Sequence, residues 1–216
     1  MAWQKDKYKN NPPKNWKDFF DPVHFPGRRA MHVYPQESTE ILLLGDGVPK
    51  DKLYPIDGER ALAALAKAKP HIDIFWTSGA QSSQLLKDGE VDMSVMWGSR
   101  VAAVIADGAP VDFTYQDALL GFGCFAIPKG AKNVATARKM IGLMVTPEIQ
   151  ARIPDFLPYY GPINTHAFEV KSFSPEVLAK ANSSPQNKDR QVQMQPAWWA
   201  ENMQTVQEKY QALIAK

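Results

Sequence analysis

The architecture of this protein can be inferred from residues 72–106, which read IDIFWTSGAQSSQLLKDGEVDMSVMWGSRVAAVIA. The apolar run 72–76 indicates a strand, and a helix is predicted over residues 80–87. Residues 91–97 repeat the strand pattern, and a second helix is predicted to run from a cap at Ser99 to about residue 106. This order of strand, helix, strand, helix predicts an α/β fold with a mostly parallel sheet covered by helices.

Further elements are predicted on both sides of this stretch. Asn15 is expected to cap a helix over 16–20, and Asp57 a helix over 58–67. Other helices are predicted over 36–44 and 197–214, and other strands over 28–34, 111–114 and 122–127. We expect residues 1–110 to form one α/β lobe and residues 111–216 to supply crossover strands and C-terminal helices.

The composition is that of a globular protein, with 44% hydrophobic residues in 216 and a formal net charge of +2. Charges of both signs are scattered and form no basic block, so no nucleic-acid partner is expected. The apolar runs are much shorter than the ~20 residues that cross a bilayer. A single cysteine, Cys124, leaves no internal disulfide or multi-cysteine metal site, and its apolar neighbours predict a buried thiol.

Sequence signatures of catalysis are missing. The four histidines are widely separated, and no nucleophile elbow, phosphate-binding loop or dinucleotide-binding glycine motif occurs. We therefore expect no enzyme activity, no cofactor and no metal. A small α/β enzyme that uses Glu37 or Asp92 as a base stays open as an alternative, although neither carboxylate has a paired group in the sequence.

Binding is better supported, because polar and aromatic residues follow the predicted strands. In α/β sheets, ligands collect outside the carboxyl ends of the strands, where helix N-termini offer free N–H donors. After the second strand, Trp97 would supply a stacking face, Ser99 a hydroxyl and Arg100 a bidentate cation. The alternative is that Thr77 and Ser99 are ordinary helix caps and that the tryptophans belong to the core.

Seven motifs, taken in order, resemble a known family. They are NWKDFFD (15–21), FPGRRA (25–30), WTSGAQ (76–81), DGEVDM (88–93), WGSR (97–100), IPKGA (127–131) and YGPIN (160–164). Over about residues 3–168 the chain resembles the spermidine/putrescine-type extracellular solute-binding proteins of bacterial ABC importers. The resemblance implies a type II periplasmic binding protein fold, which closes by a hinge on a solute held between two lobes.

The resemblance also implies partners and a location. The partners would be a small-molecule solute and the ABC permease in the membrane, and the full-length family member would be periplasmic. The chain shows no export signal and begins near the family's first crossover. We therefore expect a member without its N-terminal lobe segment, consisting of the second lobe and the returning segments. A non-functional fragment or an interaction module is the remaining alternative.

The resemblance implies a set of solute-binding residues: Trp97, Arg100, Ser99, Tyr160, Ser78, Gln81 and Glu37. Arg100 stands where polyamine binders place an acid, and Gly123 replaces a second expected acid. Because a buried ammonium needs anionic partners, losing two carboxylates weakens the case for a polyamine. We expect a solute that is polyamine-like or carries both amine and carboxylate, such as an amino-acid derivative or opine, with its carboxylate on Arg100.

Overall fold

The computed structural model describes residues 1–121 and 123–215, which form two compact units. Unit 1 consists of residues 1–119 and 192–216, and unit 2 of residues 120–191. The expected division placed a single boundary at residue 110. In the structure, unit 1 extends to residue 119 and also includes the C-terminal helix, which returns to it. Two hydrogen bonds fix that return: Trp199 Nε1 donates to Glu40 Oε1 (2.7 Å), and Gln211 Nε2 donates to the Val33 carbonyl (2.8 Å).

Unit 1 is built on a five-stranded sheet with the order β3-β2-β4-β1-β5. Its strands are β1 (Ala2–Gln4), β2 (Arg29–His32), β3 (Ile74–Trp76), β4 (Met93–Ser94) and β5 (Val111–Phe113). Strand β2 is parallel to β3 and β4, whereas β1 is antiparallel to β4 and β5. Strand β1 therefore runs opposite to the other four, which confirms the predicted mostly parallel sheet.

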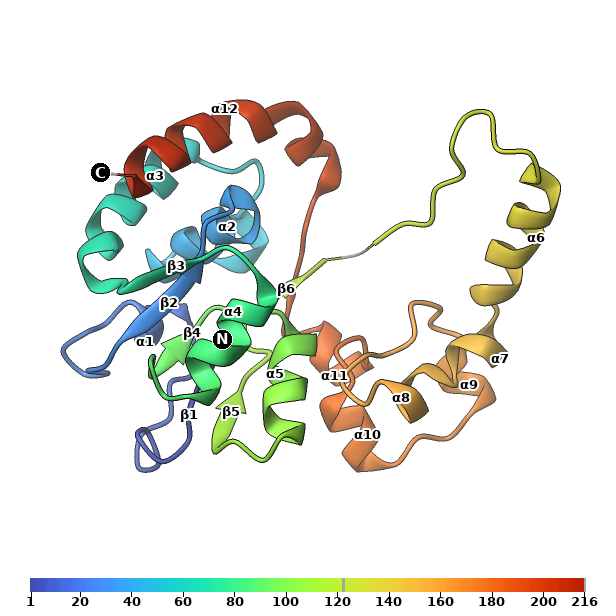
Figure 1. Ribbon diagram of the computed structural model, residues 1–216, viewed down its shortest axis with the longest axis horizontal. Helices are drawn as coiled ribbons and strands as arrows, with labels where there is room; N and C mark the ends of the chain where they lie inside the picture. The colour runs from blue at the N-terminus through green and yellow to red at the C-terminus, as the bar shows by residue number, and fades with distance from the viewer. Residues whose placement is uncertain (122, 216) are drawn as a thin grey trace. The chain divides into compact units, whose positions relative to one another are not determined.

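Helices cover the sheet in two groups (Figure 1). Helices α2 (Pro35–Gly45), α3 (Gly58–Ala68) and α12 (Pro196–Ile214) contact one another, and α4 (Gly79–Lys87) contacts α5 (Gly98–Ala106). Alternate residues of a strand point to opposite faces. Accordingly, Met31 packs in the core under the first group, and its neighbour Ala30 packs in the core with residues of α4 and α5. The short elements of unit 1 are α1 (Trp16–Phe19), η1 (Lys50–Lys52) and η2 (Lys69–His71).

The predicted helix starts are partly confirmed. Asn15 caps α1 by accepting from Lys17 N and Asp18 N, and the Asp57 carboxylate accepts from Arg60 N at the start of α3. The predicted cap at Ser99 is wrong, because α5 begins at Gly98, the residue before Ser99. Its capping residue is Trp97, which makes no side-chain cap bond. At α4 the cap is Ser78 and not Thr77.

Unit 2 consists of short helices and loops. The chain enters it through β6 (Leu119–Leu120) and leaves through β7 (Val192–Gln193), which pair with each other. Between them lie α6 (Val134–Met144), α7 (Pro147–Gln150), α8 (Ile153–Phe156), α9 (Ala167–Val170), α10 (Pro175–Lys180) and α11 (Pro185–Lys188). In the described chain, no helix combines the length and apolar character that crossing a membrane requires.

The strand predicted over 122–127 is wrong for the part of it that the structure describes. Residues 123–127 form neither strand nor helix, and Phe122 lies outside the described residues. Cys124 is exposed, which corrects the predicted buried thiol. The apolar pattern failed here because a strand also needs a neighbouring strand, and the pairing of this segment ends at Leu120.

Candidate functional site

Trp97 and Arg100 lie side by side against the first turn of α4. Trp97 follows β4 as the capping residue of α5, and its side chain is 38% exposed. A Cβ atom added to Gly79 would lie 2.6 Å from Arg100 Nε and 3.0 Å from Trp97 Cε3. The indole and the exposed guanidinium therefore form one wall beside Gly79. Because Gly79 has no side chain, it leaves room for both groups.

The two tryptophans of the strand ends have different roles. Trp76 is fully buried, and its Nε1 donates to the Val95 carbonyl at 3.1 Å. Trp97 packs edge to face on Trp76, with ring centroids 5.2 Å apart and planes at 84°. An edge-to-face pair of this kind fixes the orientation of the outer ring. Trp76 is thus a core residue, whereas Trp97 presents part of its indole to solvent.

Glu37, near the start of α2, contacts the indole nitrogen of Trp97. The Trp97 Nε1 atom donates a hydrogen bond to Glu37 Oε2 at 3.0 Å. Glu37 has a left-handed backbone with φ of 68°, and with Gln36 it forms a kink in the first turn of α2. A left-handed backbone at a residue other than glycine is uncommon and persists only where its surroundings enforce it. The kink aims the carboxylate at the exposed tryptophan.

His32 and Tyr34, which the sequence reasoning missed, complete this corner. His32 has a side-chain exposure of 1%, and its Nε2 lies 3.3 Å from Glu37 Oε2. Tyr34 is 42% exposed, and its hydroxyl donates to the Thr77 carbonyl at 2.6 Å. His32 is the last residue of β2, and Tyr34 follows the strand just before Pro35, so the rule that ligands collect at strand ends would have identified the exposed Tyr34.

Ser78 and Gln81 make hydrogen bonds at the start of α4, and Ser99 lies in α5. The Ser78 Oγ accepts from Gln81 N at 3.2 Å, and Gln81 Oε1 accepts from Thr77 N at 2.9 Å. These bonds satisfy backbone donors at the start of α4, as a capping box does. Both side chains are nevertheless exposed, and Ser99 is half-buried in the first turn of α5. Their predicted contact with a solute stays a prediction.

Tyr160 belongs to unit 2, and the structure describes it within that unit. Its side chain is 40% exposed, and its backbone N donates to the Leu157 carbonyl at 2.8 Å. The next residue, Gly161, donates from its N to Asn182 Oδ1 at 2.8 Å. Hydrogen bonds donated by backbone N–H groups therefore hold the aromatic turn, and the Tyr160 side chain is partly exposed. Its contact with a solute stays a prediction.

A second carboxylate, Glu40, lies one turn further along α2 and is fully buried. Its Oε1 accepts hydrogen bonds from the Tyr54 hydroxyl at 2.6 Å and from Trp199 Nε1 at 2.7 Å. Burial raises the pKa of Glu40, and the two hydrogen bonds oppose that rise. Because α12 supplies Trp199, this carboxyl group joins the C-terminal helix to the helix that carries Glu37.

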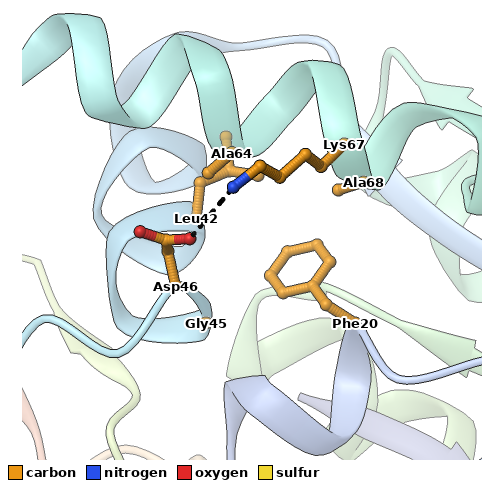
Figure 2. A pocket seen from close by; sticks show the side chains of 7 residues that line it. All are labelled: Phe20, Leu42, Gly45, Asp46, Ala64, Lys67 and Ala68. Atoms are coloured by element: carbon orange, nitrogen blue, oxygen red, sulfur yellow. Dashed lines mark ion pairs between the residues drawn. The ribbon is translucent and has the colours of Figure 1, made fainter.

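Two open hollows in unit 1 lie away from these residues. One, of about 150 Å³, is shown in Figure 2, where Lys67 Nζ lies 3.9 Å from Asp46 Oδ1 beside the Phe20 ring. The other, of about 270 Å³, lies between α1, the end of α2 and η1. None of the seven predicted binding residues lines either hollow. Among the described residues, no three histidine, cysteine, aspartate or glutamate side chains are grouped to hold a metal ion.

The corner of unit 1 thus offers a cation on Arg100, an anion on Glu37 and an aromatic face on Trp97. These are groups that recognise a small charged molecule. The γ-aminobutyric acid-binding protein of Pseudomonas aeruginosa is 29% identical over 209 residues, which cover 94% of this chain and 58% of that protein.

Solved structures extend the likeness to three dimensions. An ABC transporter substrate-binding protein from Bradyrhizobium japonicum USDA 110 is 42% identical, with a TM-score of 0.95 over 99% of this chain and 66% of its own. The periplasmic binding protein MotA from Agrobacterium tumefaciens B6, solved with glucopine, is 37% identical with a TM-score of 0.88, over 99% of this chain and 67% of its own.

The chain spans about three fifths of the length of the curated relative and about two thirds of each solved one. Over residues 1–185 it matches the family of bacterial extracellular solute-binding proteins. This match confirms the resemblance inferred from the seven motifs and the fold that it implied. The protein is a member of the bacterial extracellular solute-binding protein family.

Proposed function

We propose that the protein is the solute-binding component of an ABC importer, acting outside the cytoplasmic membrane, and that its solute carries both an amine and a carboxylate. The observation that carries this proposal is the exposed Trp97 indole, which packs beside Arg100 and donates to Glu37. The guanidinium would bind the carboxylate of the solute, and Glu37 would bind its ammonium group. The indole would cover the aliphatic chain between them.

Two of the relatives named above support this class of solute. The curated relative is named for γ-aminobutyric acid, which has an amine at one end and a carboxylate at the other. MotA was solved in complex with glucopine. A diamine would place a second ammonium beside Arg100, and this like-charge contact is unfavourable. The proposal therefore favours an amino acid or an opine over a polyamine.

Transport requires that binding be coupled to a change of shape. A solute that binds the closed form more tightly than the open form shifts the population toward the closed form. The permease would then recognise the closed form and receive the solute. No chemical change of the solute is part of this mechanism, and the relatives named above are binding proteins and not enzymes.

The test is a titration of this chain, followed by its tryptophan fluorescence, against three solutes: γ-aminobutyric acid, putrescine and butyrate. Arg100→Gln and Glu37→Gln should each weaken binding of γ-aminobutyric acid about 10- to 100-fold, the effect of losing one charge-assisted hydrogen bond. Glu59→Gln, which breaks an exposed pair with Lys209, is the control and should leave binding unchanged. Unchanged affinity in both site variants would exclude the proposed site.

A further inference from the structure

We infer that the C-terminal helix α12 holds the Glu37 carboxylate in place and that Gln211 is a positioning residue of the solute site. The inference rests on the proposed function, because it concerns the carboxylate that would bind the amine of the solute. Helix α12 carries none of the seven predicted binding residues. It lies across α2 and α3 (Figure 1), and its side chains reach the backbone that leads into α2.

The backbone at the start of α2 is unusual. Gln36 is extended, with φ of −56° and ψ of 142°, and Glu37 has φ of 68° and ψ of −50°. The Glu37 angles are close to those of a γ-turn that is rare and strained. Tyr34, the capping residue of α2, makes no side-chain cap bond in the described chain. Since strained backbone persists only where its surroundings enforce it, other contacts must hold this turn.

Helix α12 supplies two of these contacts before the kink. The Tyr210 hydroxyl donates to the His32 carbonyl at 3.3 Å, and Gln211 Nε2 donates to the Val33 carbonyl at 2.8 Å. Consecutive residues of α12 therefore hold consecutive carbonyls where the chain leaves β2. Backbone carbonyls need partners, and side chains of a neighbouring helix supply them here.

A third contact from α12 lies after the kink. Trp199 Nε1 donates at 2.7 Å to Glu40 Oε1, which also accepts from the Tyr54 hydroxyl at 2.6 Å. Glu40 and Trp199 are both buried. One helix therefore anchors the chain at residues 32–33 and again at residue 40. These two anchors set the span that residues 34–39 must bridge, and with it the direction in which Glu37 points.

Gln211 differs from the other contacts because α12 does not need it to stay in place. The Tyr210 ring is buried, at 1% exposure, and Lys69 Nζ donates to the Leu213 carbonyl at 2.9 Å. Gln211 is half-buried, and its amide group bonds to the Val33 carbonyl. Loss of this amide should therefore leave α12 docked and release the start of α2.

Held in this way, the Glu37 carboxylate is ordered before a solute arrives. Trp97 Nε1 donates to its Oε2 at 3.0 Å, so the carboxylate is already fixed at the position proposed for the solute amine. A site that is ordered beforehand loses less entropy on binding than one that its ligand must order. Without the Gln211 bond, the binding energy of the solute would be partly offset by the cost of ordering the kink.

The first arm of the experiment needs no solute. It follows the NMR signal of the Trp97 indole N–H, which is assigned by its loss in Trp97→Phe. In Gln211→Met, which keeps a long unbranched side chain but has no donor, this signal should move toward its position in Glu37→Ala. Gln211→Lys restores a donor of similar reach and should return the signal to its natural position. Gln204→Met is the control, because Gln204 is exposed on the same helix and bonds to Glu208 one turn away.

The second arm measures affinity for γ-aminobutyric acid and stability to urea. Gln211→Met should weaken binding about fivefold, the effect of one neutral hydrogen bond. Gln211→Lys should recover most of that affinity, and Gln204→Met should keep the natural value. Tyr210→Phe, which removes the bond to the His32 carbonyl, is the second variant and should move the indole signal in the same direction. It decides the question if Gln211→Met does not fold.

An indole signal that stays in place in both Gln211→Met and Tyr210→Phe would overturn the inference. So would a Gln211→Met variant that loses stability but binds γ-aminobutyric acid as the natural protein does, because the bond would then be structural only. A signal that moves in Gln211→Met and is restored in Gln211→Lys, in a protein that binds none of the three solutes, would support the positioning role and refute the proposed function.

Discussion

The Trp97 indole nitrogen donates to Glu37 Oε2 across 3.0 Å, and this bond joins the start of α5 to the start of α2. The two residues are 60 positions apart in the chain. The bond holds together the aromatic and the anionic parts of the proposed site, and it is made by a glutamate whose backbone is left-handed.

The left-handed backbone of Glu37 can be tested by its effect on stability. With φ at 68°, a residue with a Cβ atom is strained and glycine is not. Glu37→Ala and Glu37→Gly both remove the carboxylate, so the difference between them isolates the strain. We expect the glycine variant to be more stable to urea by about 1 kcal/mol. Equal stability of the two variants would show that the kink carries no strain.

Gly79 should be required for the wall that Trp97 and Arg100 form. Its replacement by alanine places a Cβ 2.6 Å from Arg100 Nε and 3.0 Å from the indole, so both side chains must move. We expect Gly79→Ala to weaken γ-aminobutyric acid binding about tenfold, with a loss of stability of about 1–3 kcal/mol. Gly58→Ala is the control, because a Cβ there meets nothing within 4 Å. Unaltered affinity in Gly79→Ala would contradict the described wall.

The buried carboxyl of Glu40 predicts a pH dependence of stability. Its pKa is raised above the ordinary value of 4.5, so between pH 4.5 and the raised pKa the folded state holds a proton that the unfolded state releases. The contribution of Glu40 to the free energy of unfolding is fully present below pH 4.5 and is lost as the pH rises from there to the raised pKa. Urea unfolding at several pH values should show the natural protein losing stability relative to Glu40→Gln as pH increases. The opposite slope would mean that the pKa is lowered.

Helix α6 predicts self-association. It exposes 59% of Met140 and 56% of Leu143, and none of its residues is buried. A helix with so much apolar surface normally packs against another element. Sedimentation should show larger species as concentration rises, and Met140→Lys with Leu143→Lys should suppress them. Val23→Lys, at a position 79% exposed in unit 1, is the control. A monomer at all concentrations would contradict the predicted self-association through α6.

Local sequence signals predicted the elements of unit 1 well. Asn15 and Asp57 cap helices because their side chains satisfy N–H groups two or three residues away. The alternating strand and helix pattern around Trp76 also gave the correct sheet. Residues 123–127 were mispredicted because an apolar pattern does not say whether a partner strand exists.

The site was predicted only in part. Trp97 and Arg100 could be identified because they follow a strand and start a helix, and the structure brings them together at Gly79. His32 was missed because a buried histidine on a strand has no local signature. Its proximity to Glu37 depends on the kink at residues 36–37, where Glu37 has a left-handed backbone and no glycine reveals it.

The most direct test of the proposed site is calorimetric titration of this chain with the three solutes named above. An amine and a carboxylate on one molecule engage both Glu37 and Arg100, whereas a diamine or a simple carboxylate engages one of them and leaves the other unpaired. We predict that γ-aminobutyric acid binds at least about tenfold more tightly than putrescine or butyrate. Binding of putrescine that equals or exceeds that of γ-aminobutyric acid would contradict the assignment of Arg100 to a solute carboxylate.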